Sequence, residues 1–385
     1  MRVALAGGIT GGHLFPLLCV GEALQQQGHQ VLFIGARHGL EARLALPFPA
    51  LLLDMSGLRP AARRPWRLPL TLWRARREAK RALQQFDADL LFCTGGYGSV
   101  PVALAQRARR KPMILLEPDA VPGRANRWLT RWARAICLNF EEAAPHFPAH
   151  VPTFRTGLPT RAGIYRPEVP MEAARAQFEL LPDRFTVLVI GGSQGAQSLN
   201  ETVLNTVQYL PSSELQWLHI TGEAHYETVC ATADRLALNG NYRPLPFLDA
   251  EQMGLAYRAA DVVVARAGAG TITELALNGL AAVLIPYPHA AGGHQRYNGE
   301  AMAKREAALL IEQQELSPER LARALLMLRD CPQQRLKLSQ HARQWVIPDA
   351  TARVLKVIQS VGSDLPDLSD LSDLSDRSDR SDSTL

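Results

Sequence analysis

The chain has 385 residues, of which 47% are hydrophobic and 21% charged, and its formal net charge is +5. This length and composition predict a globular protein with two buried cores and hence two domains. No run of 18 uncharged apolar residues is present, which argues against a membrane-spanning helix, and the first residues enter a predicted strand without a signal-peptide pattern. The five scattered cysteines form no CxxC pair, so reduced, cytosolic thiols are expected. The ten histidines show no HExxH or paired spacing, and no metal or other cofactor is predicted.

Short apolar runs alternate with helical patterns along residues 1–160. The strands expected here are Val3–Ala6, Val31–Ile34, Leu51–Leu53, Leu90–Thr94, Met113–Leu116, Ala135–Leu138 and Phe154–Thr156. The helical patterns between them include Leu17–Gln27, Leu70–Gln85 and Asn126–Ala133. Strands that alternate with helices predict a mainly parallel sheet.

A second series of the same kind begins at Phe185 and continues through Leu215–Thr221, Asp261–Ala265, Ala282–Pro286 and Ala308–Ile311. Two such series predict an α/β protein with two Rossmann-like, doubly wound domains facing each other across a cleft. We place the first domain at residues 1–160 and the second at 161–362, with the last helix packing back on the first domain. A near-period-three Ser-Asp repeat occupies residues 363–385, which are predicted to be a disordered tail.

Three glycine-rich turns say most about the chemistry. They are Gly7–His13, Gly95–Ser99 and Gly191–Ala196, and each follows a short apolar run and precedes a helical pattern. Such a turn lets backbone N–H groups approach an anion closely, and the following helix adds the positive end of its dipole. Any tight strand-to-helix connection can use glycine, but three turns in these positions indicate a site that handles phosphate groups.

The turns are part of an ordered set of motifs. TGGH stands at Thr10–His13, GGYxS at Gly95–Ser99, GGSQGA at Gly191–Ala196, GxxTxxE at Gly268–Glu274 and HQxxN at His294–Asn298. With this order of motifs, the chain resembles, from residue 1 to about 358, the peptidoglycan GlcNAc transferases of glycosyltransferase family 28, which act on undecaprenyl-linked muramyl-pentapeptide. The resemblance implies a GT-B fold, an inverting mechanism, and UDP-GlcNAc bound mainly by the C-terminal domain.

The resemblance also implies a set of donor-binding residues. By resemblance, Gln295 contacts the GlcNAc hydroxyls, and the region of Phe247-Leu248 holds the uracil. Arg161 resembles an arginine of the family that lies near the donor, and it could help to neutralise the leaving diphosphate. The full set expected to bind UDP-GlcNAc is Thr10, Gly11, Gly12, Asp119, Arg161, Ser193, Leu248, Ala269, Gly270, Thr271, Glu274 and Gln295.

The chemistry of the residues agrees with this assignment at two positions. Backbone amides of Gly191–Gly195 and the Ser193 hydroxyl suit a diphosphate, where the alternative is a tight structural turn. Glu274 can accept hydrogen bonds from both ribose hydroxyls, where the alternative is a carboxylate that only interacts with a helix dipole.

Inverting transfer requires a base for the acceptor hydroxyl and stabilisation of the departing UDP. His13 is the candidate base, because the start of a helix lowers the pKa of an imidazole and keeps it neutral. The alternative is a histidine that only hydrogen-bonds the acceptor or the loop.

Glu117 is a second catalytic candidate. The residues expected in the acceptor and diphosphate loops are Gly95, Gly96, Tyr97, Ser99 and Asn126. No DxD-type acidic pair precedes the donor motif, so a helix dipole and an arginine are expected in place of a metal.

Several positions depart from the family pattern. The family usually has HEQN after the fifth strand, and this chain has Leu116-Glu117-Pro118-Asp119, so a charge stands where an asparagine is expected to touch the sugar. Ile9 replaces a glycine of the first turn, Val100 a glycine of the second, and Ala267 a serine. These changes concern the acceptor side more than the donor site.

A basic, tryptophan-containing segment suits the headgroup layer of an anionic membrane. Between Arg59 and Arg81 there is one acidic residue, Glu78, and nine basic ones: Arg59, Arg63, Arg64, Arg67, Arg74, Arg76, Arg77, Lys80 and Arg81. Trp66, Leu68, Leu70, Leu72 and Trp73 lie among them, and a second cationic face carries Arg124, Arg127, Arg131 and Arg134 beside Trp128 and Trp132. The alternatives are a solvated helix face and a nucleic-acid patch, for which no binding motif is present.

The leading hypothesis is a peripheral enzyme at the cytoplasmic face of the plasma (inner) membrane. It would move GlcNAc from UDP-GlcNAc to the 4-hydroxyl of the muramyl sugar on lipid I, giving lipid II for peptidoglycan, cell shape and division. Expected partners are the donor, the undecaprenyl-linked acceptor, an anionic membrane surface and other wall-synthesis and division proteins, without nucleic acid. Two alternatives remain open: a related GT-B enzyme with another lipid acceptor such as diacylglycerol, and a catalytically weak UDP-sugar-binding scaffold. An NAD-dependent dehydrogenase ranks low because the first turn is not GxGxxG.

Overall fold

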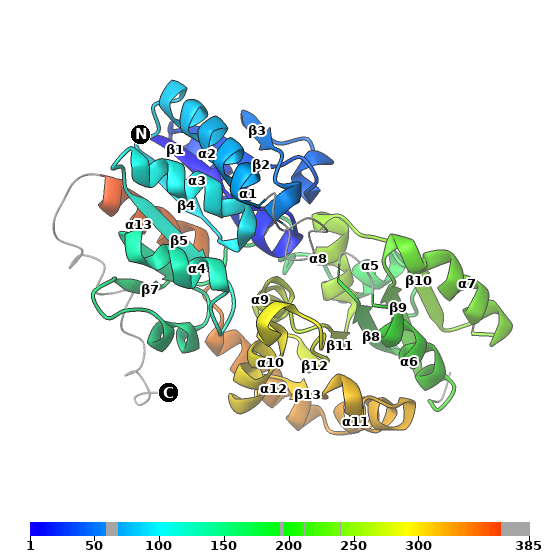
Figure 1. Ribbon diagram of the computed structural model, residues 1–385. Coiled ribbons are helices and arrows are strands. Elements are labelled where there is room, and N and C mark those ends of the chain that lie inside the picture. Colours follow the sequence, from blue (N-terminus) through cyan, green and yellow to red (C-terminus); the bar gives the residue numbers. More distant parts are fainter. Residues whose placement is uncertain (59–67, 193–195, 211–212, 239, 363–385) are drawn as a thin grey trace, which may run out of the picture. The chain divides into compact units, whose positions relative to one another are not determined.

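The computed structural model of the protein describes residues 1–58, 68–192, 196–210, 213–238 and 240–362. The chain divides into two compact units (Figure 1). Unit 1 contains Met1–Thr160 and the chain from Ile347 onward, and unit 2 contains Arg161–Val346. The Ser-Asp repeat that was predicted to be a tail lies outside the described residues.

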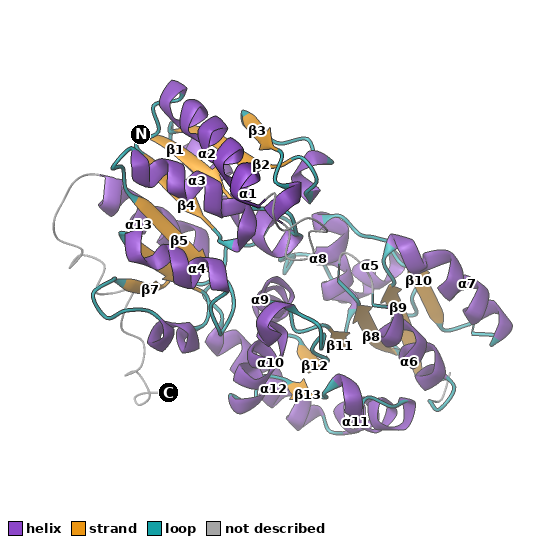
Figure 2. Ribbon diagram, in the orientation of Figure 1, coloured by secondary structure: helices purple, strands orange, loops and turns teal. Residues whose placement is uncertain are grey.

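Unit 1 is built on a seven-stranded sheet with the strand order β3-β2-β1-β4-β5-β6-β7, in which every neighbouring pair is parallel (Figure 2). Its strands are β1 (Arg2–Ala6), β2 (Gln30–Ala36), β3 (Ala50–Leu53), β4 (Leu90–Cys93), β5 (Met113–Glu117), β6 (Ala135–Leu138) and β7 (Thr153–Arg155). Its helices are α1 (Gly11–Gln26), α2 (Leu68–Gln85), α3 (Gly96–Ala108), α4 (Arg124–Leu129) and α13 (Ala350–Gly362).

Different helices cover the two faces of this sheet. Ala4 and Ala6 of β1 belong to a buried cluster with residues of α2, α3 and α4. A Cβ placed on Gly21 of α1 would instead lie 2.8 Å from Leu5. Because successive strand residues point to opposite faces, α1 covers the face opposite α2, and α13 packs beside α1. Burial on both faces explains why the strands are continuous apolar runs in the sequence.

Unit 2 contains a six-stranded sheet with the order β10-β9-β8-β11-β12-β13, again with parallel neighbours throughout. Its strands are β8 (Phe185–Ile190), β9 (Leu215–Ile220), β10 (Tyr242–Leu245), β11 (Val262–Ala265), β12 (Ala281–Leu284) and β13 (Leu309–Leu310). Its helices are α5 (Met171–Ala176), α6 (Gln197–Val207), α7 (Tyr226–Arg235), α8 (Ala250–Ala259), α9 (Ala269–Asn278), α10 (His294–Lys304), α11 (Pro318–Asp330) and α12 (Pro332–Trp345).

The core of unit 2 is organised in the same way. Val187 and Val189 of β8 pack in one buried cluster with α6, α7 and α11. Helices α8 and α9 contact each other, and α8 contacts β8, but neither contributes to that cluster, so they cover the other face of the sheet. The predicted α/β class with two doubly wound parallel sheets is confirmed.

Strand β10 is an element that the sequence did not predict. Its segment includes Arg243 and Pro244, and a proline without an N–H argues against a central strand. The strand lies at the edge of the sheet formed by the described residues, where Pro244 pairs with His219 of β9 and none of those residues forms a strand on the other side. An edge strand needs hydrogen bonds on one side only, which is why proline is tolerated there.

The helix predicted at Asn126–Ala133 is shorter in the structure. Helix α4 ends at Leu129, and a 3-10 turn, Thr130–Trp132, follows.

The strand order reverses beside the first strand of each unit. In unit 1, β2 and β3 follow β1 toward one edge of the sheet, and β4 lies on the other side of β1 and begins the series toward the other edge. In unit 2 the same reversal lies between β8 and β11. At such a reversal the two loops that leave the carboxyl ends of neighbouring strands diverge, which opens the space where ligands bind in doubly wound sheets. The first two glycine turns, Gly191 and Gly192 of the third, and the Arg266–Gly268 segment lie at these points.

Candidate functional site

The first glycine turn joins β1 to α1 and is held by hydrogen bonds to a buried carboxylate. Glu41 is 1% exposed, and its carboxylate oxygens accept the backbone N–H groups of Ile9 and Ala36, both at 2.7 Å. A Cβ on Gly8 would lie 2.9 Å from this carboxylate, so a glycine is needed there. Ile9 has φ +74°, a left-handed conformation that is unfavourable for a β-branched residue. Sequence reasoning did not find Glu41, because no local motif marks a residue that acts 32 positions away.

His13 lies in the first turn of α1 and is oriented by the end of β4. Its Nδ1 lies 3.0 Å from the carbonyl oxygen of Thr94, and the Thr94 hydroxyl donates to the His13 carbonyl, also at 3.0 Å. A carbonyl oxygen can only accept, so Nδ1 carries the proton in the neutral ring and Nε2 carries the lone pair. A Cβ on Gly96 would lie 3.9 Å from Nε2. The structure therefore brings the predicted base and the second glycine turn together.

The second glycine turn is supported by buried polar side chains. Gly95 has φ +79°, and a Cβ there would lie 2.3 Å from Oδ1 of Asn126. Ser99 is fully buried, with its hydroxyl 3.1 Å from the carbonyl oxygen of Ala6, so its side chain connects two loops within the unit rather than facing outward. The Tyr97 hydroxyl lies 3.1 Å from Nε2 of His38.

Glu117 ends β5 and has its carboxylate inside the unit, 2% exposed. It accepts hydrogen bonds from the Asn126 side chain at 2.8 Å and from the backbone N–H groups of Asp119 and Gly123 at 3.1 and 3.3 Å. Burial, followed by the nearby charge of Asp119, raises the pKa of Glu117 to about 8. This geometry favours a positioning role for Glu117 over the catalytic role predicted from the sequence, since it orders the loop from Pro118 to Gly123.

In unit 2 the loops at the strand reversal leave room beside their backbones. Ser193, predicted to bind the diphosphate, lies outside the described residues. Gly192 has φ +88°, and a Cβ added to Gly192, Gly268 or Gly270 would meet no atom of the described residues within 4 Å. Helix α9 begins at Ala269 without a side-chain cap, so the N–H groups of Ala269, Gly270 and Thr271 point out of its first turn. Open backbone with N–H groups at a helix start is the arrangement that binds phosphate.

Glu274 lies one turn further along α9 and is held by two neighbours. Its Oε1 is 3.4 Å from Nη2 of Arg161, and its Oε2 accepts a hydrogen bond from the Tyr257 hydroxyl at 2.8 Å. Burial raises the pKa of Glu274, and the charge of Arg161 and the bonds from Tyr257 and Arg161 oppose that rise. The structure thus brings two predicted donor residues, Glu274 and Arg161, together with Tyr257, which had not been predicted.

The remaining predicted donor residues of unit 2, Gln295 and Leu248, lie on two separate segments. Gln295, in the first turn of α10, accepts the backbone N–H of Tyr287 through Oε1 at 2.9 Å, which orients its amide. Leu248, between β10 and α8, is 6% exposed, whereas its neighbour Phe247 is 51% exposed. The predicted donor residues Thr10, Gly11, Gly12 and Asp119 belong to unit 1.

Arg266, directly after β11, is a further residue to which the sequence assigned no role. It is 5% exposed, and Nη1 donates to the side chain of Gln313 at 2.6 Å and to the carbonyls of Ile285 and Pro286. Its Nη2 donates to the Ser198 hydroxyl at 3.2 Å, and burial lowers its pKa to about 10. The guanidinium therefore connects the start of α6, which follows one predicted phosphate loop, to the residues just after β12.

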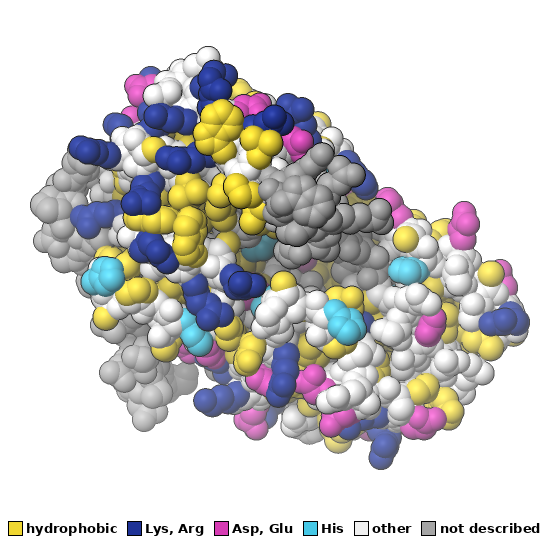
Figure 3. All heavy atoms as spheres, viewed as in Figure 1, with side chains coloured by type: hydrophobic (Ala, Val, Ile, Leu, Met, Phe, Trp, Pro, Cys, Tyr) yellow, Lys and Arg dark blue, Asp and Glu magenta, His cyan; other side chains and the backbone are white. Residues whose placement is uncertain are grey.

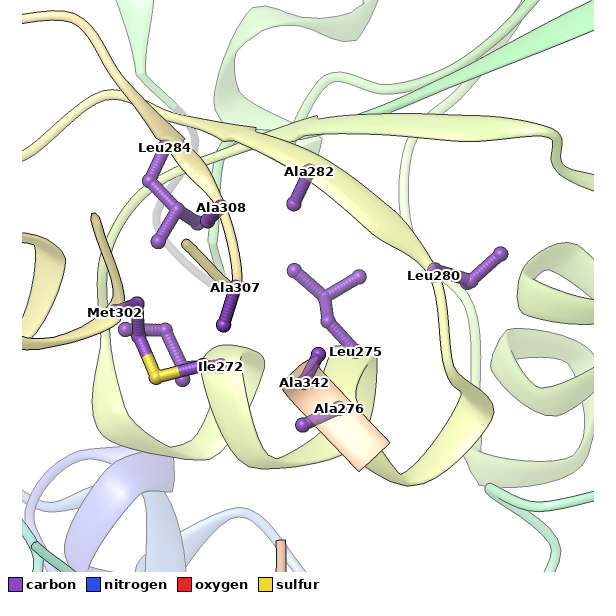
Figure 4. A pocket seen from close by; sticks show the side chains of 10 residues that line it. All are labelled: Ile272, Leu275, Ala276, Leu280, Ala282, Leu284, Met302, Ala307, Ala308 and Ala342. Atoms are coloured by element: carbon purple, nitrogen blue, oxygen red, sulfur yellow. The ribbon is translucent and has the colours of Figure 1, made fainter. Parts of the chain in front are cut away.

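Two cavities of unit 2 do not belong to this site. An apolar cavity of about 10 Å³ lies between α9, β12 and α12 and is lined only by hydrophobic side chains (Figure 4). It is no larger than a single water needs and offers no polar partner. A hollow of about 570 Å³ lies at the amino ends of β11 and β12, beside Asp261 and Ala281, whereas the glycine loops lie at the carboxyl ends. Among the described residues, no group of three or more His, Cys, Asp or Glu side chains lies close enough to hold a metal ion.

Two doubly wound parallel-sheet units, each with glycine loops where its strand order reverses, are the architecture of the GT-B class. The family models give the particular family: the glycosyltransferase family 28 N-terminal domain matches residues 3–138, and the family 28 C-terminal domain matches residues 186–359. The chain belongs to glycosyltransferase family 28.

Similar proteins cover almost the whole chain. A relative from Syntrophotalea carbinolica is 37% identical over 369 residues, covering 94% of this chain and 99% of the relative. One from Bacillus subtilis (strain 168) is 33% identical over 368 residues, with the same coverage. Both are named UDP-N-acetylglucosamine–N-acetylmuramyl-(pentapeptide) pyrophosphoryl-undecaprenol N-acetylglucosamine transferase.

Solved structures are also similar to this chain over almost its whole length. The crystal structure of Acinetobacter baumannii MurG is 31% identical, with a TM-score of 0.74, and covers 93% of this chain and 99% of that one. A UDP-GlcNAc 2-epimerase from Neisseria meningitidis, bound to UDP-GlcNAc, has a TM-score of 0.66 at 13% identity, with coverage of 94% of this chain and 100% of that chain. At that identity the likeness shows the fold alone.

The conformation of Ile9 gives a first prediction. Ile9→Ala removes the packing of the side chain but keeps a Cβ at positive φ, whereas Ile9→Gly removes both. We expect Ile9→Gly to be more stable than Ile9→Ala by about 1 kcal/mol, because glycine adopts the left-handed region without strain. Urea denaturation followed by circular dichroism measures the difference. Equal or reversed stabilities would show that the loop is not strained.

The Glu117–Asp119 pair gives a second prediction. Because folding raises the pKa of Glu117 from 4.5 to about 8, its contribution to stability is present at low pH and is lost as the pH rises through that interval. Asp119→Asn removes a charge that raises this pKa, so the variant should have a higher Tm than the parent at pH 8, with a smaller difference at pH 5. About 1 kcal/mol shifts the Tm of a unit of this size by roughly 2–4 °C.

Thermal unfolding at a series of pH values tests this expectation. Asp183→Asn, at an exposed carboxylate of unit 2, is the control and should follow the pH profile of the parent. A profile of Asp119→Asn parallel to the parent would contradict the coupling.

Proposed function

We propose that this chain transfers GlcNAc from UDP-GlcNAc to the 4-hydroxyl of the muramyl sugar of undecaprenyl-diphospho-MurNAc-pentapeptide, converting lipid I to lipid II in peptidoglycan synthesis. The observation that carries the proposal is the family 28 match across both units, with an open loop set at the strand reversal of each. The names of the two relatives describe transfer of N-acetylglucosamine between UDP-N-acetylglucosamine and N-acetylmuramyl-(pentapeptide) pyrophosphoryl-undecaprenol. The chain is accordingly an N-acetylglucosaminyltransferase.

Unit 2 binds the donor in this proposal. The diphosphate lies against the first turn of α9 and the loop after β8, where N–H groups and open backbone are available. The carboxylate of Glu274 accepts the ribose hydroxyls, and Gln295 contacts the GlcNAc hydroxyls. Arg161 stabilises the charge that develops on the diphosphate as the bond from C1 of GlcNAc to UDP breaks, with the helix dipole adding to this effect. No metal is required for this stabilisation.

Unit 1 activates the acceptor in this proposal. The lone pair on Nε2 of His13 takes the proton from the 4-hydroxyl while its oxygen attacks C1 of GlcNAc from the face opposite UDP, which inverts the anomeric carbon. Thr94 supports this step because its carbonyl holds the Nδ1 proton and so selects the tautomer with Nε2 unprotonated. The Glu117–Asn126 pair holds the second glycine turn beside the imidazole.

We also propose that the enzyme docks on an anionic membrane through unit 1. None of the helices in the described part of the chain has the length and apolar character needed to span a bilayer. On the face that carries α2, α3 and α4, hydrophobic side chains lie among arginines and lysines (Figure 3). Leu68, Leu70 and Trp73 of α2 and Trp128 of α4 are all more than a third exposed. The predicted contributions of Arg59, Arg63, Arg64, Trp66 and Arg67 lie outside the described residues.

Arginines surround the tryptophans of this face. The Arg77 guanidinium lies 5.4 Å from the ring centroid of Trp73, and that of Arg107 lies 4.1 Å from the ring of Trp132. Trp128 and Trp132 meet edge to face, with their ring centroids 4.9 Å apart. Tryptophan and arginine together suit the interfacial layer, where the ring is buried at headgroup depth and the cation meets lipid phosphate.

An activity assay tests the proposed reaction. Purified protein incubated with UDP-GlcNAc and a lipid I analogue should release UDP and form the disaccharide lipid. His13→Ala should lower kcat by roughly 10²–10⁴-fold, as expected for loss of a general base, with an unchanged KM for UDP-GlcNAc. Absence of product from the parent protein would reject the proposal. Transfer to diacylglycerol instead would favour the alternative acceptor that the Leu116–Asp119 departure allows, and UDP-GlcNAc binding without turnover would favour the scaffold alternative.

Vesicle binding tests the membrane proposal. The double variant Leu70→Ser and Trp73→Ser removes two exposed apolar groups and should weaken binding to phosphatidylglycerol vesicles at least about tenfold, since burial of each such side chain contributes about 1.5–3 kcal/mol. Leu336→Ser, at an exposed leucine of α12 in unit 2, is the control and should bind like the parent. Flotation with the vesicles measures both, and unchanged binding of the double variant would refute this surface.

A further inference from the structure

Tyr257 has a hydroxyl group that the packing of its ring does not explain. The side chain lies on α8, is 2% exposed and is among the largest fully buried side chains of the protein. A phenylalanine would fill the same apolar space. The hydroxyl donates to Oε2 of Glu274 at 2.8 Å, so a buried polar group is directed at the carboxylate expected to meet the nucleotide. Buried hydroxyl groups need such a partner, because an unpaired one is costly.

The Glu274 carboxylate is fixed at both oxygens. Tyr257 contacts Oε2, and Arg161 lies 3.4 Å from Oε1. Each carboxylate oxygen can accept two hydrogen bonds, so both retain the capacity to accept a ligand hydroxyl. The Glu274 side chain is 15% exposed, which leaves part of it accessible. Two contacts from different elements define the orientation of the carboxylate before any ligand binds.

The elements that supply these contacts are themselves locked together. A Cβ on Gly254 of α8 would lie 2.0 Å from the carbonyl oxygen of Gly163, so α8 lies directly against the segment that follows Arg161. Gly254 precedes Tyr257 by one helical turn and therefore shares its face. On α9, the Asn278 side chain donates to the carbonyl of Ile164 at 3.1 Å. The positions of Tyr257, Arg161 and Glu274 are thus set by one rigid junction.

The protonation states suit this arrangement. Burial and the neighbouring Glu274 raise the pKa of Tyr257 well above its usual value, so the phenol keeps its proton and remains a donor. The hydrogen bond from Tyr257 opposes the effect of burial on the pKa of Glu274 and so favours the ionised carboxylate. An ionised carboxylate only accepts hydrogen bonds, which is what two adjacent ribose hydroxyls require.

We propose that Tyr257 is a positioning residue for the donor nucleotide: its hydroxyl fixes the carboxylate of Glu274 so that it accepts the ribose hydroxyls, and it thereby sets the preference of the enzyme for a ribonucleotide over a 2′-deoxynucleotide. This rests on the proposed role of Glu274 in binding UDP-GlcNAc. Tyr257 does not touch the nucleotide itself. Its effect is therefore confined to hydroxyls that Glu274 contacts.

Calorimetric titration of the full chain with UDP and with 2′-deoxy-UDP tests the proposal. Tyr257→Phe keeps the ring and removes only the hydroxyl. We expect it to weaken UDP binding by about 10–100-fold, the range of a lost hydrogen bond to a charged group, and to weaken 2′-deoxy-UDP binding much less. The ratio of the two dissociation constants should fall accordingly. In the Glu274→Gln background, Tyr257→Phe should have little further effect on either ligand.

A matched control separates positioning from general damage to the fold. Tyr242 is also 2% exposed in unit 2, and its hydroxyl contacts Nδ1 of His219, away from Glu274. Tyr242→Phe should leave the UDP to 2′-deoxy-UDP ratio of the parent unchanged. In turnover, Tyr257→Phe should raise the KM for UDP-GlcNAc and leave kcat within about twofold.

The outcomes distinguish this proposal from the proposed function. A parent protein that does not bind UDP would reject the proposed function itself. If the parent binds UDP and Glu274→Gln leaves the ratio unchanged, Glu274 does not contact the ribose. The inference about Tyr257 is then rejected, while the proposed glycosyltransferase function is not. If Glu274→Gln lowers the ratio and Tyr257→Phe does not, Tyr257 has no positioning role. Equal weakening of both ligands by Tyr257→Phe would likewise reject it.

Discussion

A parallel sheet opens a gap at its carboxyl edge only where the strand order reverses, because there the loops of two adjacent strands lead to helices on opposite faces. The rest of this structure depends on that constraint. It places the first two glycine turns side by side after β1 and β4, and it places the loop after β8 beside the start of α9. Segments separated by more than 80 residues, such as His13 and Thr94, come within hydrogen-bonding distance for this reason alone. Each of the two units has its own reversal of strand order, with loops at the carboxyl ends of the adjacent strands.

Buried carboxylates stabilise the loops at these gaps. Glu41 holds the first turn through backbone N–H groups, Glu117 holds the loop after β5, and Glu274 is itself held by Tyr257 and Arg161. A buried carboxyl group needs several hydrogen-bond donors to offset its lost hydration, so the loops that supply those donors are held in place. For a transferase this rigidity is useful, because donors that are already in place stabilise developing charge without having to reorganise. The departure at Asp119 places a negative charge beside one of these networks and helps to raise the pKa of Glu117.

The two units differ in what surrounds this common design. Unit 1 has exposed tryptophans and leucines among arginines on the helices that cover one face of its sheet, a composition suited to a lipid-linked acceptor. Unit 2 instead has open backbone at a helix start, which suits phosphate groups, and a carboxylate held by Tyr257 and Arg161, which suits ribose hydroxyls. The chemistry of the two units thus supports the proposed division, in which unit 1 meets the acceptor and unit 2 the donor.

The amino-acid sequence by itself determined the two alternating series of strands and helices, the parallel sheets and the position of the glycine turns, because buried strands and tight turns leave local patterns. Those patterns also carried the family resemblance, while the roles of individual residues such as His13 and Gln295 stay predictions. The edge strand β10 was missed, since its proline is tolerated only by its place in the sheet. Only the tertiary structure decided that Glu117 lies inside a loop network and that Glu41, Arg266 and Tyr257 support the site. These residues act through contacts between segments distant in the chain, and such contacts exist only once the sheets have set which loops are neighbours.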